Sequence, residues 1–238
     1  MAELIVALDV PSIAEARTVL EALDGLPVMY KIGAEAFAAY FPEIREELHR
    51  RGMRSFIDLK LHDIPRTVAA AIRSLIEPGV QIIDVHALGG AEMMAAAVEA
   101  AEERASELGI PPPEIFAVTI LTSIGAEDLR ELGLTGGPGE NAIRLAALAR
   151  DARCSGVVCS PLEVTDLKNF FGAEFKTLTP GIRPGRSAHG DQKRLSTPAE
   201  AVAAGTDYVV VGRPILEAPD RRQAAEEILA ELATATVA

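Results

Sequence analysis

The sequence contains no tryptophan, and aromatic residues make up only 4% of its 238 residues. Hydrophobic residues nevertheless account for 49% of the chain, so Ala, Leu, Val and Ile must fill most of the interior. An interior of aliphatic side chains is typical of helices packed on strands. The sequence therefore predicts an α/β protein that is able to bury a sizeable core.

Cysteine and long apolar runs are also scarce. Cys154 and Cys159 are five residues apart on one expected strand, and this odd spacing points their side chains to opposite faces, which argues against a disulfide between them. No apolar run has the roughly 20 residues needed to span a membrane. The first residues, "MAELIVALDV", are acidic and form too short a segment for a secretory signal. We therefore expect a reduced, cytoplasmic protein without a membrane partner.

Basic residues are outnumbered, with 23 Lys and Arg against 35 Asp and Glu and a net charge of −12. This excess of negative charge argues against a nucleic-acid partner. It does not exclude a small anionic substrate, because a binding site can be locally basic.

Strand-like and helix-like segments alternate along the whole chain. One helical stretch, 91–108, carries an apolar stripe at helical spacing, and Ser12 and Thr197 stand where helix N-caps belong. The expected strands are 4–9, 28–33, 53–60, 80–87, 115–121, 155–160, 175–181 and 207–212.

Eight strand–helix units in a chain of this length are typical of a (β/α)8 barrel, which usually has about 250 residues. The main rival is an open doubly wound sheet, but no glycine-rich dinucleotide turn follows the first strand. No Ser- or Pro-rich linker divides the chain. We therefore predict a TIM barrel that forms a single domain over residues 1–238.

The stretch "FIDLKLHDIP", residues 56–65, places charges in an otherwise apolar strand. Strand alternation puts Asp58 and Lys60 on the face opposite Ile57 and Leu59, and therefore inside the barrel. Active sites of such barrels lie at the carboxyl ends of the strands. A buried ion pair often adds no net stability over apolar residues, which favours a functional role for this pair.

Other ionisable residues fall near the ends of neighbouring strands. Asp9 ends the first expected strand and Lys31 lies near the end of the second, although either alone could be a structural ion pair. Asp84 and His86 close the fourth strand, and His86 is expected to be a satisfied interior histidine. Together these positions predict a charged cavity at the mouth of the barrel.

A second informative stretch is the long polar loop between the seventh strand and Thr197, "TPGIRPGRSAHGDQKRLSTP". The eighth strand ends in Gly212 and Arg213. Loops after strands seven and eight are the usual phosphate-binding place in a barrel. Gly lets backbone N–H groups approach an anion, and the guanidinium of Arg can donate two parallel hydrogen bonds to a phosphate. We therefore expect a phosphate site at these two residues.

The motifs "ALDV", "YKIG", "DLKLHDIPRTV", "TPGIR", "DQKR" and "VVVGRPI" resemble those of orotidine 5′-phosphate decarboxylases of the short bacterial and archaeal type. The D-x-K-x-x-D spacing is shared with metal-dependent sugar-phosphate enzymes on the same barrel, such as 3-keto-L-gulonate 6-phosphate decarboxylase and hexulose-phosphate synthase. Those relatives carry an acidic metal ligand at the end of the second strand, where this sequence has Lys31. The resemblance therefore favours the metal-free nucleotide enzyme.

This resemblance implies a carboxy-lyase that converts orotidine 5′-monophosphate (OMP) to uridine 5′-monophosphate (UMP) and CO2, the last step of UMP biosynthesis. It implies no cofactor, no metal, and a homodimer with shared active sites. The catalytic residues it implies are Lys31, Asp58, Lys60, the proton donor, and Asp63. The substrate-binding residues it implies are Asp9, Lys31, Thr67, Thr122, Arg183, Gln192, Gly212 and Arg213.

Within this assignment, Asp63 and Thr67 are expected to reach the neighbouring subunit's site, and Arg183 and Gln192 to belong to a lid. The contacts of Arg186 and His189, in the same loop, are not predicted. Two alternatives stay open from the residues alone: a metal-dependent sugar-phosphate lyase or synthase, and a phosphate-ligand binding protein without catalysis.

Overall fold

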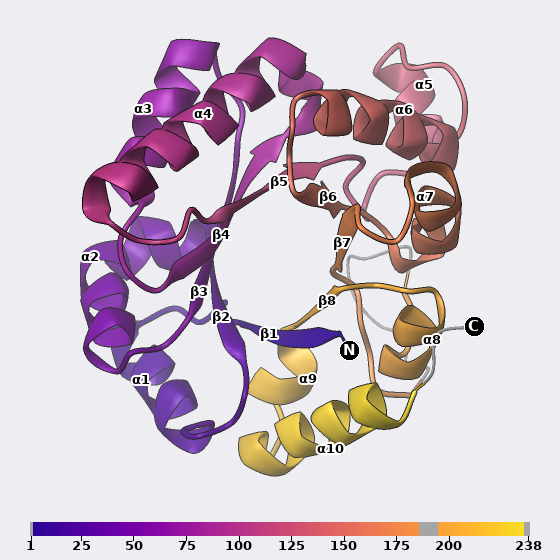
Figure 1. Cartoon of the computed structure of the whole chain (residues 1–238). Coiled ribbons are helices and arrows are strands. Elements are labelled where there is room, and N and C mark those ends of the chain that lie inside the picture. Colours follow the sequence, from indigo (N-terminus) through magenta and orange to yellow (C-terminus); the bar gives the residue numbers. More distant parts are fainter. Residues whose placement is uncertain (1, 186–194, 236–238) are drawn as a thin grey trace.

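The computed structural model describes residues 2–185 and 195–235. In this part of the chain, eight parallel strands close into one barrel in the order β1 to β8, each hydrogen-bonded to the next and β8 to β1. The helices surround the barrel on its outside (Figure 1). The predicted (β/α)8 barrel is confirmed.

The strands are β1 (Glu3–Ala7), β2 (Met29–Gly33), β3 (Ser55–Leu61), β4 (Val80–His86), β5 (Glu114–Val118), β6 (Gly156–Val158), β7 (Lys176–Thr179) and β8 (Tyr208–Val211). The helices are α1 (Ile13–Ala22), α2 (Ala34–Arg50), α3 (Pro65–Leu75), α4 (Ala91–Leu108), α5 (Ala126–Glu131), α6 (Pro138–Asp151), α7 (Val164–Phe171), α8 (Pro198–Ala203), α9 (Arg213–Leu216) and α10 (Arg221–Thr234), with short 3-10 turns η1 (Ala87–Gly89) and η2 (Pro161–Glu163).

Side-chain alternation along the strands divides the core into two layers. One face of each strand packs under the helices, where Leu4, Ile57 and Val209 belong to the larger apolar cluster. The opposite face fills the inside of the barrel with a second cluster: Ile5, Ala7, Met29, Phe56, Ile82, Phe116, Val118, Val158, Leu178 and Val210. This inner layer is packed with side chains, as expected for a barrel of this size, and it forms a floor beneath the carboxyl ends of the strands.

The expected helix signals act as predicted. The Ser12 hydroxyl accepts a hydrogen bond from the Glu15 N–H at the start of α1, and the Thr197 hydroxyl accepts one from the Glu200 N–H at the start of α8. Helix α4 has the predicted limits and is capped at its C-terminus by Gly109, whose φ of 66° suits glycine. No helix in the described ranges combines the length and the apolar character that crossing a membrane requires.

Cys154 and Cys159 are both buried and both free, so the expectation of no disulfide between them is confirmed. They flank β6 instead of lying within it, because that strand is only three residues long. Burial raises the pKa of the Cys154 thiol to about 12. Cys154 is therefore a protonated, apolar part of the packing.

Candidate functional site

Along the inward faces of the strands, apolar side chains in the inner layer are followed by charged side chains at the mouth of the barrel. On β2, Lys31 follows Met29 on the inward face, and on β3, Asp58 and Lys60 follow Phe56. The inward positions nearest the amino ends of these strands are apolar and close the barrel. The next positions toward the carboxyl ends are charged, so the charges lie on an apolar floor.

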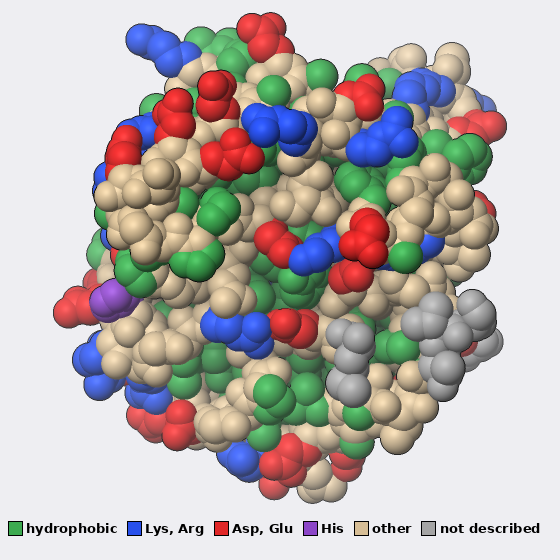
Figure 2. All heavy atoms as spheres, viewed as in Figure 1, with side chains coloured by type: hydrophobic (Ala, Val, Ile, Leu, Met, Phe, Trp, Pro, Cys, Tyr) green, Lys and Arg blue, Asp and Glu red, His purple; other side chains and the backbone are tan. Residues whose placement is uncertain are grey.

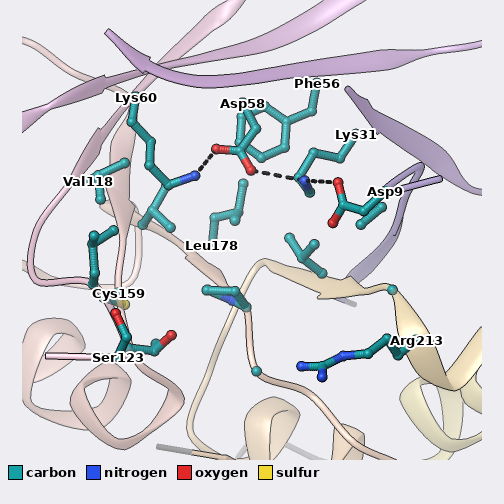
Figure 3. A pocket seen from close by; sticks show the side chains of 18 of the residues that line it. Asp9, Lys31, Phe56, Asp58, Lys60, Val118, Ser123, Cys159, Leu178 and Arg213 are labelled. Atoms are coloured by element: carbon teal, nitrogen blue, oxygen red, sulfur yellow. Dashed lines mark hydrogen bonds and ion pairs between the residues drawn. The ribbon is translucent and has the colours of Figure 1, made fainter. Parts of the chain in front are cut away.

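These side chains form a continuous chain of ion pairs (Figure 3). The ammonium of Lys31 lies 3.0 Å from Oδ1 of Asp9 and 3.1 Å from Oδ2 of Asp58. The other carboxylate oxygen of Asp58, Oδ1, accepts a hydrogen bond from the ammonium of Lys60. Acidic and basic groups therefore alternate in the order Asp9, Lys31, Asp58, Lys60, which holds both ammonium groups in fixed places.

Burial and neighbouring charges oppose each other at this chain of ion pairs. Burial would lower the pKa of Lys31, but the Asp58 and Asp9 carboxylates more than compensate and raise it above its usual value. Burial would raise the pKa of Asp58, but the ammonium groups of Lys31 and Lys60 hold it well below its usual range. Lys31 and Asp58 are therefore both charged at neutral pH.

The close approach of Asp9 and Lys31 explains the glycine at position 33. A Cβ on Gly33 would lie 2.7 Å from Nζ of Lys31 and 2.9 Å from Oδ1 of Asp9. At distances this short the ammonium and the carboxylate must shift, so a side chain here would displace the ion pair. The motif "YKIG" thus contains both Lys31 and the glycine that leaves room for its ammonium.

The backbone of Lys60 departs from regular strand geometry. Its φ is 49°, in the left-handed region, which costs a residue with a side chain roughly 1–2 kcal/mol. The register against β4 also shifts here, because Ile57 pairs with Ile83 while Leu61 pairs with Val85. Four steps along β3 match two along β4, so β3 bulges between these pairs. Strained backbone at a site residue is typical of positions fixed for function.

The charged chain lines one side of a cavity of about 770 Å³ at the barrel mouth. Arg213 lies on the other side of this cavity, away from Lys60 (Figure 3). The charged side chains of the lining are balanced in sign: Lys31, Lys60, Arg183 and Arg213 against Asp9, Glu35, Asp58 and Glu217. On the face shown in Figure 2, acidic and basic side chains are likewise interspersed. The net negative charge of the chain therefore does not exclude an anionic ligand from this cavity.

Most of the predicted site residues come together in this cavity: Asp9, Lys31, Asp58, Lys60, Thr122, Arg183, Gly212 and Arg213. Two do not line it. Asp63 and Thr67 are exposed, on the loop after β3 and in the first turn of α3. Asp63 accepts a hydrogen bond from the Ile64 N–H at 2.6 Å. Gln192, Arg186 and His189 lie outside the described residues.

The sequence predicted Asp84 among the charges at the mouth, but Asp84 does not line the cavity. The sequence interpretation did not name Glu35 and Glu217, which do line it. Asp84 follows Ile82 on the inward face of β4 and is fully buried beside β3. Strand alternation places Asp84 on the inward face of β4, as it places Asp58 and Lys60 on that of β3, but Asp84 lies too deep to reach the cavity. Glu35 lies in α2 and Glu217 directly follows α9, so strand alternation gives no signal for either.

His86 is half-buried at the end of β4, and its Nδ1 accepts a hydrogen bond from the Leu88 N–H at 3.3 Å. Its ring stacks on that of His62 at 5.4 Å between centroids. Burial first, and then the charges of His62 and Lys60, lower the pKa of His86 to about 4. His86 is therefore a neutral, half-buried histidine that caps η1, less enclosed than the interior residue that was expected.

A closed parallel barrel with charged side chains and a cavity at the carboxyl ends of its strands is the architecture of a (β/α)8-barrel enzyme. Residues 2–228 match the model of the "Orotidine 5′-phosphate decarboxylase / HUMPS family". The chain belongs to this family.

Relatives that carry the decarboxylase name cover almost the whole chain. The orotidine 5′-phosphate decarboxylase of Vibrio cholerae serotype O1 is 44% identical over 97% of this chain and 98% of its own length. That of Moorella thermoacetica is 46% identical over 97% of this chain and 92% of its own. The crystal structure of the enzyme from Lactobacillus acidophilus superposes with a TM-score of 0.86, at 36% identity over 98% of this chain and 99% of that one.

Proposed function

We propose that the protein decarboxylates OMP to UMP and CO2, the step that completes UMP synthesis. The observation that carries this proposal is the alternating chain Asp9–Lys31–Asp58–Lys60 along one side of the cavity. The family assignment and the relatives that bear this name support the choice of substrate. The metal-dependent sugar-phosphate enzymes are disfavoured, because an ammonium stands at position 31 between two carboxylates.

In the proposed reaction, the bond between C6 of the pyrimidine and its carboxylate breaks. CO2 departs, and the electron pair of that bond stays on C6 as a carbanion. The ammonium of Lys60 stabilises this charge and then donates a proton, so an N–H bond breaks and a C6–H bond forms. Neutral Lys60 then regains a proton from water, and one proton is consumed for each CO2 released.

Asp58 and Lys31 keep this donor ready for use. The Asp58 carboxylate accepts a hydrogen bond from the ammonium of Lys60 and holds that group in place. Lys31 contacts the other carboxylate oxygen of Asp58 and keeps this group ionised. Only 9% of the Lys31 side chain is exposed. Because these groups are fixed before substrate enters, the site needs little reorganisation during the reaction. Asp9, at the outer end of the chain of ion pairs, is proposed to bind ribose hydroxyls together with Lys31.

The opposite side of the cavity is proposed to bind the remainder of the nucleotide. Arg213 is exposed and follows Gly212, so a phosphate there could receive a bidentate contact from the guanidinium and backbone N–H groups. Thr122, which is buried in the lining, is placed to contact the pyrimidine. Arg183 and Gln192 are proposed to belong to a lid over the phosphate.

Asp63 and Thr67 are proposed to complete the site of a second subunit. Both residues are exposed and lie outside the cavity of their own chain. Asp63 comes only three residues after Lys60, so a symmetric partner docked against this surface could exchange the same residues in return. The working unit would then be a homodimer with two shared sites.

The experiment that tests the proposed function is an absorbance assay with OMP in the presence of EDTA. Turnover to UMP and CO2 in EDTA is expected, and the Lys60→Ala protein, which lacks the proton donor, is the matched control. Turnover of a sugar phosphate that stops in EDTA would favour the metal-dependent alternative. Binding of UMP without release of CO2 from OMP would favour a binding protein.

A further inference from the structure

Asp84 contacts the backbone of the proposed proton donor, Lys60. It is on the inward face of β4, fully buried, and paired in register with Phe116 of β5. Its Oδ1 accepts a hydrogen bond from the backbone N–H of Lys60 at 2.8 Å. Its Oδ2 is buried and receives no hydrogen bond from any donor in the described part of the chain. A buried carboxyl oxygen without a donor is rare enough to require an explanation.

The explanation comes from the second carboxyl group beside it. The side chains of Asp84 and Asp58 are within hydrogen-bonding reach of each other. Two ionised carboxylates cannot share a buried contact of this kind, but one proton between them turns repulsion into a hydrogen bond. The ammonium groups of Lys31 and Lys60 both contact Asp58 and keep it ionised. The proton therefore resides on Asp84, and Oδ2 is free to donate it.

This contact coincides with the strained part of β3. Lys60 has a φ of 49° at the point where β3 bulges away from regular pairing with β4. The hydrogen bond to Asp84 is made where the regular pairing of β3 with β4 is interrupted. It fixes the peptide from which the Lys60 side chain extends toward the cavity.

We propose that Asp84 is a positioning residue for the proton donor: a neutral carboxylic acid whose one oxygen accepts the Lys60 backbone N–H and whose other oxygen donates to the Asp58 carboxylate. Asp84 does not line the cavity, so it acts only through these two residues. The role rests on the proposed decarboxylation, in which Lys60 and Asp58 do the chemistry.

The charges around Asp84 support a neutral acid. Those that face it are Asp58 and Lys60 from β3, whereas β5 places the apolar Phe116 opposite. Burial, and then the negative charge of Asp58, raise the pKa of Asp84 well above its usual value, and the charge of Lys60 only partly opposes this. Asp84 therefore keeps its proton at neutral pH while Asp58 does not.

The first test compares Asp84→Asn with Asp84→Leu. An amide has the same acceptor and donor as a neutral acid, so the Asn protein is expected to keep kcat within about threefold of wild type. Leu has neither group, and kcat for OMP is expected to fall about 10- to 100-fold, with KM less affected. Thr177→Val, which removes a buried hydroxyl on the far side of the barrel, is the control for lost stability alone. Equal impairment of Asn and Leu, or full activity of Leu, would overturn the proposal.

The second test observes the proton itself and does not depend on turnover, so it separates this proposal from the proposed function. The infrared difference spectrum of wild type minus Asp84→Asn is expected to show the carbonyl band of a protonated carboxylic acid at neutral pH, shifted in D2O. This measurement does not use Asp84→Leu, so it tests the proposal even if that variant fails to fold. A carboxylate band in place of the acid band would overturn the proposal even if OMP is turned over normally.

Discussion

Replacing Lys60 by glycine is expected to give a more stable protein than replacing it by alanine, which reverses the usual order in a strand. Both changes remove the ammonium, so the two variants differ only in the backbone. At a φ of 49°, alanine retains a steric cost of roughly 1–2 kcal/mol, whereas glycine has none. Glycine loses about 0.4–1 kcal/mol through the greater freedom of its unfolded chain. The balance favours glycine by about 0.5–1 kcal/mol, or roughly 1–4 °C in Tm for a chain of this size.

The assay is reversible urea unfolding of both variants, supported by thermal melts. Gln81 provides a matched control, since it is exposed on the neighbouring strand β4 and has no positive φ. At Gln81 the glycine variant should be the less stable one. An alanine variant at position 60 that equals or exceeds the glycine variant would refute the strain argument. Both Lys60 variants should fold and lack decarboxylation, and near-normal turnover in either would refute the role of Lys60 as proton donor.

Three further outcomes are expected. Arg213→Ala should reduce kcat/KM severely for OMP and far less for orotidine, because only OMP carries the phosphate; equal proportional losses would place Arg213 outside the phosphate site. Mixing inactive Lys60→Ala and Asp63→Ala subunits should restore about a quarter of wild-type sites, because half the dimers are mixed and each has one intact site; no recovery despite exchange confirmed by a tagged-subunit pull-down would refute the shared site. Because the folded pKa of Asp58 is lowered, its contribution to stability is present above the unfolded pKa of about 4 and lost as pH falls toward the folded one. The urea midpoint of Asp58→Asn should therefore depend less on pH below about 4 than that of wild type, and parallel acid profiles would contradict this.

The order and number of the strands could be predicted because alternation has a period of two and the helices between strands are amphipathic. Strand ends were less accurate. The fifth strand was expected to continue to residue 121, but β5 ends at Val118. The residues from Thr119 to Leu121 are as apolar or β-branched as the strand itself, so composition alone does not mark the point where hydrogen bonding to the neighbouring strands stops.

The candidate site was predictable where it depends on alternation, as at Lys31, Asp58 and Lys60. The left-handed backbone of Lys60 was not, because it arises from an uneven register between β3 and β4 that neither strand reveals alone. The contact of Asp84 with Lys60 was not predicted for a related reason, since it is made across that register. The proposed places of Asp63 and Thr67 depend on a second subunit, and a single sequence carries no direct signal for it.

The apolar layer inside the barrel also determines the route by which small molecules enter and leave the site. Phe56, Phe116 and Leu178 are almost fully buried and close the barrel below Asp58. In the proposed reaction CO2 is formed at this closed end, beneath the nucleotide, so both products must depart by the entrance that the substrate used. Water that recharges Lys60 arrives by the same route. Lys60 is then protonated once for each nucleotide that binds, and each binding event transfers one proton to C6.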